Sequence, residues 1–221
     1  MSMESLKIAI PKGRLYDEVV KACLNTDLLD DSQNISKLSR ELVQEVSGTG
    51  NLFLLAKPAD VPAYVEHGAA DIGFTGKDVI AEKERRLYEL LDLEIGTCDL
   101  VVAVPNDMDV NTLEDIKDNT RVATSYPGIA EKFFRDKNIK AEIIELNGSV
   151  ELAPQVDLAD IIVDITSTGT TLRKNDLSPI AEILSSSVRL VVNEASYRTK
   201  ATAIDRLSRQ LEKYLKKTGD N

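Results

Sequence analysis

The residues best suited to chemistry stand in the segment DIIVDITSTGTTL, from Asp160 to Leu172. An apolar run, which we expect to be a strand, ends there at Asp164, and five hydroxyl side chains and one glycine follow within the next residues. These residues are Thr166, Ser167, Thr168, Gly169, Thr170 and Thr171. A helix is expected to begin near the glycine, and the first N–H groups of a helix bind anions well. The segment predicts a site for a terminal phosphate monoester.

A heavily capped helix start without a ligand is the alternative, because Ser and Thr favour N-caps on their own. The spacing excludes a Walker loop, since GxxxxGK[ST] is absent. Two carboxylates accompany the loop, Asp164 at the strand end and Glu151 at the start of a helix expected over Val150–Val156. They would accept hydrogen bonds from a sugar diol or hold Mg²⁺ through water. For Glu151 alone, an acid favoured by the helix dipole is the simpler explanation.

A second polar set follows the first apolar run. PKGRL puts Lys12, Gly13 and Arg14 between a strand and a helix, which suits a pyrophosphate or triphosphate. Arg40 and Lys57 are further candidate cations, and Lys57 directly follows another apolar run. Ordinary solvated surface cations are the alternative.

The segment ADIGFTGKD ends a further strand in small residues, namely Asp71, Gly73, Thr75 and Gly76. A tight strand-to-helix turn that needs glycine would explain the segment equally well. His67 is most simply a residue at a helix C-terminus, and Cys98 a core residue.

The elements that must position these residues alternate along the chain. Strands are expected at 6–10, 52–56, 70–76, 88–95, 99–104, 121–125, 141–146, 160–165 and 184–195. Helical patterns begin near residues 15, 59, 79, 112, 129, 150 and 169, and an amphipathic helix with a stripe from Ala201 to Tyr214 ends the chain. Residues 25–50 fit a helix or a hairpin. This order predicts an α/β fold of mainly parallel sheets with helices on both faces, and ligands at the carboxyl ends of strands.

Extended crossings near 95–100 and 186–193 suggest two lobes. Lobe I would hold residues 1–96 and 186–221, and lobe II residues 97–185. A net charge of −10, from 27 basic and 37 acidic residues, argues against nucleic acid as a partner. Membrane spans and a secretory signal are not expected, so a cytoplasmic location fits best. Two distant cysteines and one histidine make a disulfide framework or a zinc site improbable.

Taken together, IAIPKGRL, SREL, AKPADVPAYVEHGAADIGFTGKD, LNGSVELAP and ADIIVDITSTGTTLRKNDL resemble the ATP phosphoribosyltransferase family, which opens histidine biosynthesis. The resemblance runs from about Ile8 to Arg198. It implies a two-lobed fold similar to type II periplasmic binding proteins, with the active site in the cleft. The chain ends soon after Leu215, so we expect the short form, without a C-terminal regulatory domain. That form would make a homo-oligomer and a hetero-oligomer with a regulatory subunit related to histidyl-tRNA synthetase.

The resemblance also implies the reaction: adenine N1 of ATP attacks C1 of phosphoribosyl pyrophosphate and releases pyrophosphate, with Mg²⁺. Asp164 to Thr171 would hold the 5′-phosphate, with Glu151 and Asp164 near the ribose hydroxyls. Arg14, Arg40 and Lys57 would be the catalytic cations. Lys12, Gly13, Asp71, Gly73, Thr75 and Gly76 would line the side that binds ATP and pyrophosphate.

Two positions depart from the family pattern. Asp157 stands where glycine is usual, for which we expect a local backbone adjustment, and Lys57 stands where many relatives have arginine. A non-catalytic two-lobed protein that binds a nucleotide or another anion is the alternative function, because folds are shared between functions.

Overall fold

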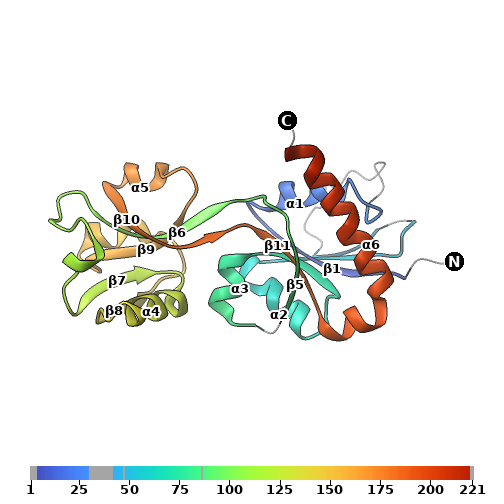
Figure 1. Ribbon diagram of the computed structural model, residues 1–221, viewed down its shortest axis with the longest axis horizontal. Helices are drawn as coiled ribbons and strands as arrows, with labels where there is room; N and C mark the ends of the chain where they lie inside the picture. Colours follow the sequence, from blue (N-terminus) through green and yellow to red (C-terminus); the bar gives the residue numbers. More distant parts are fainter. Residues whose placement is uncertain (1–3, 30–41, 47, 86, 220–221) are drawn as a thin grey trace. The chain divides into compact units, whose positions relative to one another are not determined.

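The computed structural model describes residues 4–29, 42–46, 48–85 and 87–219, which form two compact units. Unit 1 extends to Gly96 and resumes at Ser187, and unit 2 holds Thr97–Ser186. The chain therefore leaves unit 1 once and returns to it once, as the sequence colours of Figure 1 show. Each unit is built on its own sheet.

Unit 1 contains a six-stranded sheet in the order β2-β3-β1-β4-β11-β5. Its strands are β1 (Lys7–Pro11), β2 (Val43–Glu45), β3 (Leu52–Ala56), β4 (Ile72–Gly76), β5 (Tyr88–Asp92) and β11 (Val188–Val192). The central strands β3, β1 and β4 run parallel, while β2 and β11 join them antiparallel. The central strands read as continuous apolar runs because both of their faces are covered.

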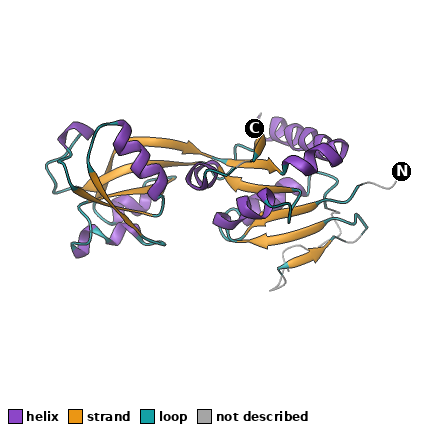
Figure 2. Ribbon diagram, turned by 90° about the horizontal axis from the view of Figure 1, so that it is seen from below, coloured by secondary structure: helices purple, strands orange, loops and turns teal. Residues whose placement is uncertain are grey.

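Helices cover both faces of this sheet (Figure 2). They are α1 (Tyr16–Cys23), α2 (Val61–Glu66), α3 (Lys77–Lys83) and α6 (Glu194–Gly219), with a 3₁₀ turn η2 (Pro58–Asp60) before α2. α1 and α6 share one core with Ile10 and Phe74, and α2 and α3 pack on the opposite face. There, a Cβ added to Gly73 would lie 2.7 Å from Val65 Cγ2, so this glycine lets α2 lie close against the sheet.

Unit 2 contains a five-stranded sheet in the order β10-β6-β9-β7-β8. Its strands are β6 (Cys98–Pro105), β7 (Thr120–Thr124), β8 (Ala141–Glu145), β9 (Ile161–Thr166) and β10 (Leu177–Ser186). α4 (Pro127–Asp136) covers one face. The other face packs against α5 (Thr170–Lys174), the 3₁₀ turn η4 (Val150–Leu152) and Ala153, which precedes the 3₁₀ turn η5 (Pro154–Val156).

The expected α/β architecture is confirmed, but both sheets are mixed rather than mainly parallel. In unit 2, β7 pairs parallel with β8 and β9, whereas β6 pairs antiparallel with both β9 and β10. The helix expected over Val150–Val156 is wrong: two 3₁₀ turns stand there, bounded by Ser149 and Asp157 in left-handed conformations. Thr112 likewise precedes only a 3₁₀ turn, η3 (Leu113–Asp115), with Asp115 accepting hydrogen bonds from the backbone before it.

Two further differences concern strands. The single strand expected over 184–195 is wrong: β10 ends at Ser186 in the sheet of unit 2, and β11 begins at Val188 in the sheet of unit 1. The sequence does not show that β10 begins at Leu177, because it is an edge strand with register shifts in which Pro179 and polar residues give no strand pattern. The ambiguous segment 25–50 yields β2, while residues 30–41 lie outside the described part of the chain.

Candidate active site

The hydroxyl-rich loop joins β9 to α5 in unit 2, at the carboxyl end of the middle strand of the sheet. Gly169 precedes α5 with φ of 69°, in the left-handed region that glycine adopts without strain. Among the described residues, no acceptor lies opposite the N–H groups of Ser167, Thr168, Thr170 and Thr171. These N–H groups are therefore available to an anion.

Three of the five hydroxyl groups take part in hydrogen bonds within the loop. Thr166 Oγ1 accepts from the N–H of the glycine at 3.0 Å, and the hydroxyls of Thr168 and Thr170 lie 2.9 Å apart. The hydroxyls of Ser167 and Thr171 are exposed and have no partner in the described chain. A hydroxyl that accepts one hydrogen bond can still donate its own proton. The loop thus offers both backbone and side-chain donors.

Two carboxylates, Asp164 and Glu151, lie close enough beside this loop to repel each other. Asp164 is partly buried on β9, and its Oδ1 accepts the N–H of Ile165 at 2.8 Å. Burial raises the pKa of Asp164 to about 6; the Ile165 hydrogen bond opposes this rise, and the charge of Glu151 adds to it. A carboxylate that titrates near neutral pH therefore stands next to the candidate anion site.

In unit 1, the parallel strands bring the second cation set together. Pro11 and Ala56 are register partners at the ends of β1 and β3, and the Lys12 N–H donates to Ala56 O at 2.8 Å. Lys12 and Lys57 therefore follow neighbouring strand ends. Gly13, with φ of 82°, turns the chain into α1.

The cationic side chains at this edge are exposed. Lys12, Arg14 and Lys57 have no carboxylate partner among the described residues. Three unpaired cations at one sheet edge suit a polyanion.

The end of β4 adds a buried hydroxyl to unit 1. Thr75 is fully buried, and its Oγ1 has no hydrogen-bond partner among the described residues. An unsatisfied buried hydroxyl costs free energy unless another molecule satisfies it. Gly76 is the N-cap of α3, where a Cβ would meet the carboxylate of Asp78. Thr75 and Gly76 thus fit the expected substrate side, whereas Gly73 serves the packing of α2.

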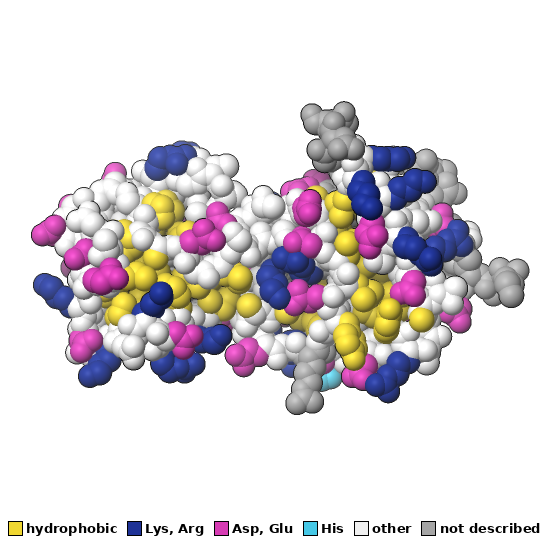
Figure 3. Space-filling model, in the orientation of Figure 1, with side chains coloured by type: hydrophobic (Ala, Val, Ile, Leu, Met, Phe, Trp, Pro, Cys, Tyr) yellow, Lys and Arg dark blue, Asp and Glu magenta, His cyan; other side chains and the backbone are white. Residues whose placement is uncertain are grey.

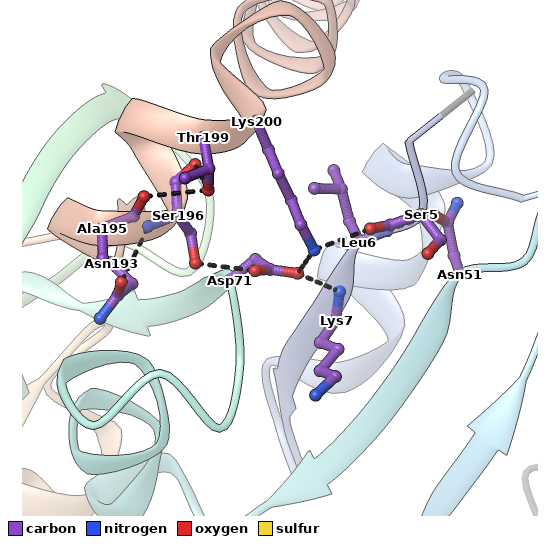
Figure 4. Close-up of polar contacts among 10 residues, drawn as sticks. All are labelled: Ser5, Leu6, Lys7, Asn51, Asp71, Asn193, Ala195, Ser196, Thr199 and Lys200. Carbon is purple, nitrogen blue, oxygen red and sulfur yellow. Dashed lines mark hydrogen bonds and ion pairs between the residues drawn. The ribbon is translucent and has the colours of Figure 1, made fainter. Parts of the chain in front are cut away.

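Asp71 lies at the opposite end of β4, about 13 Å along the strand from Thr75 at the usual rise per residue. Its carboxylate accepts hydrogen bonds from Lys200 Nζ at 2.8 Å, from Ser196 Oγ at 2.7 Å and from the Lys7 N–H at 2.8 Å (Figure 4). The structure therefore does not bring Asp71 together with the other candidate residues of unit 1. Its contacts indicate that it fastens α6 to the sheet.

Arg40 lies outside the described residues. Apart from Asp71 and Gly73, the remaining candidates form two sets, one at the carboxyl edge of the sheet in unit 1 and one in and beside the loop of unit 2.

The family model described as HisG, ATP phosphoribosyltransferase, matches residues 57–213. The chain belongs to the ATP phosphoribosyltransferase family. It is 54% identical to the ATP phosphoribosyltransferase of Halothermothrix orenii, covering 97% of this chain and 96% of that one. Against the enzyme of Caldanaerobacter subterraneus subsp. tengcongensis, the identity is 48%, over 91% of this chain and 93% of that one. The chain is accordingly a phosphoribosyl-transferring enzyme of the first step of histidine biosynthesis, and the non-catalytic alternative is not supported.

Solved structures agree with this assignment. A chain of the ATP phosphoribosyl transferase (HisG:HisZ) complex from Thermotoga maritima superposes with a TM-score of 0.82 at 35% identity, covering 96% of this chain and 98% of that one. A Bacillus subtilis amino-acid transporter extracellular-binding protein superposes with a TM-score of 0.62 at 12% identity, covering 97% of this chain and 93% of that one. The second match concerns the fold alone, and it confirms the likeness of this ATP phosphoribosyltransferase to periplasmic binding proteins.

The structure shows the backbone at Asp157, one of the two positions that depart from the expected family pattern. Asp157 adopts φ of 58° and ψ of 21°, a left-handed conformation that glycine takes most easily and Asp tolerates better than most residues.

No helix in the described ranges is long and apolar enough to cross a membrane.

Sequence reasoning did not single out two arginines near the candidate sites. Arg189 stands opposite Thr75 on β11, and its Nε is buried without a partner among the described residues. Arg173 on α5 contacts the hydroxyl-rich loop directly. In the sequence, Arg173 is marked only by its place in the segment TGTTLRKN, four residues after Gly169.

Proposed function

We propose that this chain binds phosphoribosyl pyrophosphate and ATP and joins C1 of the ribose to N1 of the adenine. The bond between C1 and the pyrophosphate oxygen breaks, and pyrophosphate leaves with the electron pair. The observation that carries this assignment is the loop from Asp164 to Thr171 in a member of the family: it combines a carboxylate with N–H groups that have no acceptor among the described residues. The loop suits the 5′-phosphate and the sugar diol at the same time.

The mechanism requires no nucleophile from the protein. Glycosyl transfer passes through an oxocarbenium-like state, in which the ribose becomes positive and the leaving pyrophosphate gains negative charge. Lys12, Arg14 and Lys57, which have no carboxylate partner in the described chain, would neutralise the leaving group or align the triphosphate. The partly buried carboxylate of Asp164 would hold the ribose hydroxyls in place.

The proposal includes Mg²⁺, whose positive charge would lower the cost of releasing pyrophosphate. The described residues contain no group of three or more His, Cys, Asp or Glu side chains able to hold a metal ion. Mg²⁺ would therefore enter mainly on phosphate oxygens of the substrate, with Glu151 and Asp164 as the nearest carboxylates of this chain in unit 2. Such substrate-borne binding is usual for Mg²⁺.

The direct test is mass spectrometry of ATP, phosphoribosyl pyrophosphate and Mg²⁺ incubated with the purified chain. A product at the mass of phosphoribosyl-ATP, with pyrophosphate released, is the expected result. If the chain alone gives no product, the same assay is repeated with a histidyl-tRNA-synthetase-like regulatory subunit from the same source. No product in either preparation would refute the proposed reaction.

We further propose that the chain forms homo-oligomers and assembles with that regulatory subunit in the cytoplasm, where both substrates occur. The Thermotoga maritima match supports the hetero-oligomer, because it was solved as a HisG:HisZ complex. Feedback inhibition by histidine would then act through the partner. Light scattering with and without the partner tests the assembly, and equal inhibition of the isolated chain by histidine would contradict the proposed route.

Asp164→Asn is expected to weaken binding of phosphoribosyl pyrophosphate about 10-fold while stabilising the fold. The pKa of Asp164 is raised to about 6, so its carboxylate form destabilises the folded state as the pH rises through that value. Because Asp164 is only partly buried, we discount the free energy that its pKa shift implies. The variant should then be more stable than the wild type by about 1 kcal/mol at about pH 8 and almost equally stable at about pH 4. Calorimetric titration and urea unfolding at both pH values measure the two effects. An unaltered dissociation constant would count against the ribose contact.

A further inference from the structure

Arg173 is fixed against the hydroxyl-rich loop, although it is exposed and was given no role above. Its Nη2 donates to the carbonyl oxygen of Thr168 at 2.8 Å and lies 3.3 Å from Thr170 Oγ1. Arg173 and Lys174 are the basic residues of α5, and Lys and Arg side chains gather over this helix in Figure 3. Lys174 is also exposed but has no contact with the loop among the described residues.

These contacts lock one peptide group of the loop from both sides. The peptide between Thr168 and Gly169 gives its carbonyl oxygen to Arg173 and its N–H to Thr166 Oγ1, at 3.0 Å. The two ends of a trans peptide point in opposite directions, so the two hydrogen bonds together set its orientation. The neighbouring N–H groups of Thr168 and Thr170 stay without a protein acceptor in the described chain.

Gly169 makes this arrangement possible. A Cβ at this position would lie 2.7 Å from Nη1 of Arg173, so in the present conformation the guanidinium occupies space that only glycine leaves open. The glycine thus provides both the left-handed turn and the space in which the arginine packs.

We infer that Arg173 is a positioning residue that holds the loop ready for the 5′-phosphate of phosphoribosyl pyrophosphate. The inference rests on the proposed function, and it adds a residue and a task to that site. Arg173 acts through the Thr168 carbonyl, and its positive charge raises the potential at the loop. Preorganised donors bind an anion more tightly than a loop that must first be ordered.

The test is calorimetric titration of the full-length chain with phosphoribosyl pyrophosphate and Mg²⁺, and separately with ATP. Arg173→Ala is expected to raise the dissociation constant for phosphoribosyl pyrophosphate about 10-fold and to leave that for ATP within about twofold. Arg173→Lys, which keeps one donor for the Thr168 carbonyl, should recover part of the loss. Lys174→Ala is the matched control and should bind like the wild type.

The outcomes separate the inference from the proposed function. If the wild type binds phosphoribosyl pyrophosphate and Arg173→Ala binds it equally well, the positioning role is wrong while the proposed function stands. Equal weakening of both substrates, with a lowered melting temperature, would show a merely structural role and would also overturn the inference. If the wild type itself does not bind phosphoribosyl pyrophosphate, the proposed function fails first.

Discussion

Arg14→Ala should lower turnover by a factor on the order of 100 or more while leaving the fold intact. Arg14 is exposed after β1, at the edge where Lys12 and Lys57 also stand, and it has no carboxylate partner among the described residues. An arginine without an internal partner contributes little to stability, so the unfolding free energy should change by less than about 0.5 kcal/mol. Removing a cation from the leaving pyrophosphate would instead raise the barrier directly. Initial rates of pyrophosphate release measure the effect.

The control for Arg14 is Lys21→Ala, an exposed cation further along α1. This variant should turn over like the wild type, because it lies away from the strand end. Arg14→Lys keeps the charge but loses the bidentate grip on a phosphate, so an intermediate rate is expected. If Arg14→Ala turned over at the wild-type rate, Arg14 would have no role in stabilising the leaving pyrophosphate. Arg40→Ala carries the same expectation from the sequence alone, since Arg40 lies outside the described residues.

Apolar runs predicted the buried strands well because burial on both faces leaves a plain signal. LFLLA and DIIVDI became β3 and β9 almost residue for residue. Apolar runs did not predict β10, because this edge strand contains Pro179 and its buried and exposed residues do not alternate strictly. Sequence prediction also failed for Val150–Val156, because Pro154 has no N–H to donate to the carbonyl oxygen of Val150, and left-handed residues bound the segment at both ends.

The candidate site could be predicted only as far as its residues follow strand ends. The order of elements placed Lys12 and Lys57 after strands, and the parallel register of β1 and β3 made them neighbours. The sequence does not show which side chains already hydrogen-bond to other groups of the protein. Thr166 Oγ1 accepts a hydrogen bond from the N–H of Gly169, and Arg173 donates one to the Thr168 carbonyl oxygen, although both residues belong to the motif. Both hydrogen bonds join residues only three and five positions apart, but they depend on the backbone conformation of the loop, which the residue types alone do not determine.

Asp71 shows most clearly that the sequence does not reveal hydrogen-bond partners, and its replacement should have a large effect on stability. Asp71→Asn should lower the unfolding free energy by about 2 kcal/mol, because it leaves Lys200 without its charged partner; the Asp71 side chain is 9% exposed and that of Lys200 is 29% exposed. Lys200 stands at a kink in α6, with φ of −123°, and it also donates to Ser5 O at 3.0 Å. The loss should therefore loosen α6 from the amino ends of β1 and β4. Urea unfolding at neutral pH measures it.

The pH dependence of the variant follows from the same contacts. Burial by itself raises the pKa of Asp71, but hydrogen bonds from Lys200, the Lys7 N–H and Ser196, together with the Lys200 charge, outweigh burial and lower it. A lowered pKa stabilises the folded state above the unfolded pKa of about 3.9, and this stabilisation is lost as the pH falls through the folded value. The difference between wild type and Asp71→Asn should therefore be constant near neutral pH and shrink below about pH 4.

ATP binding decides between this structural role and the substrate contact that the motif suggested. If Asp71 only fastens α6, the dissociation constant for ATP should stay within about twofold in Asp71→Asn under conditions where the variant is folded. The double variant Asp71→Asn/Lys200→Met should recover stability, because replacing both partners removes the unpaired charge as well as the pair. A folded Asp71→Asn chain that loses ATP affinity would restore Asp71 to the substrate site. Additive losses in the double variant would show that the two side chains do not act together.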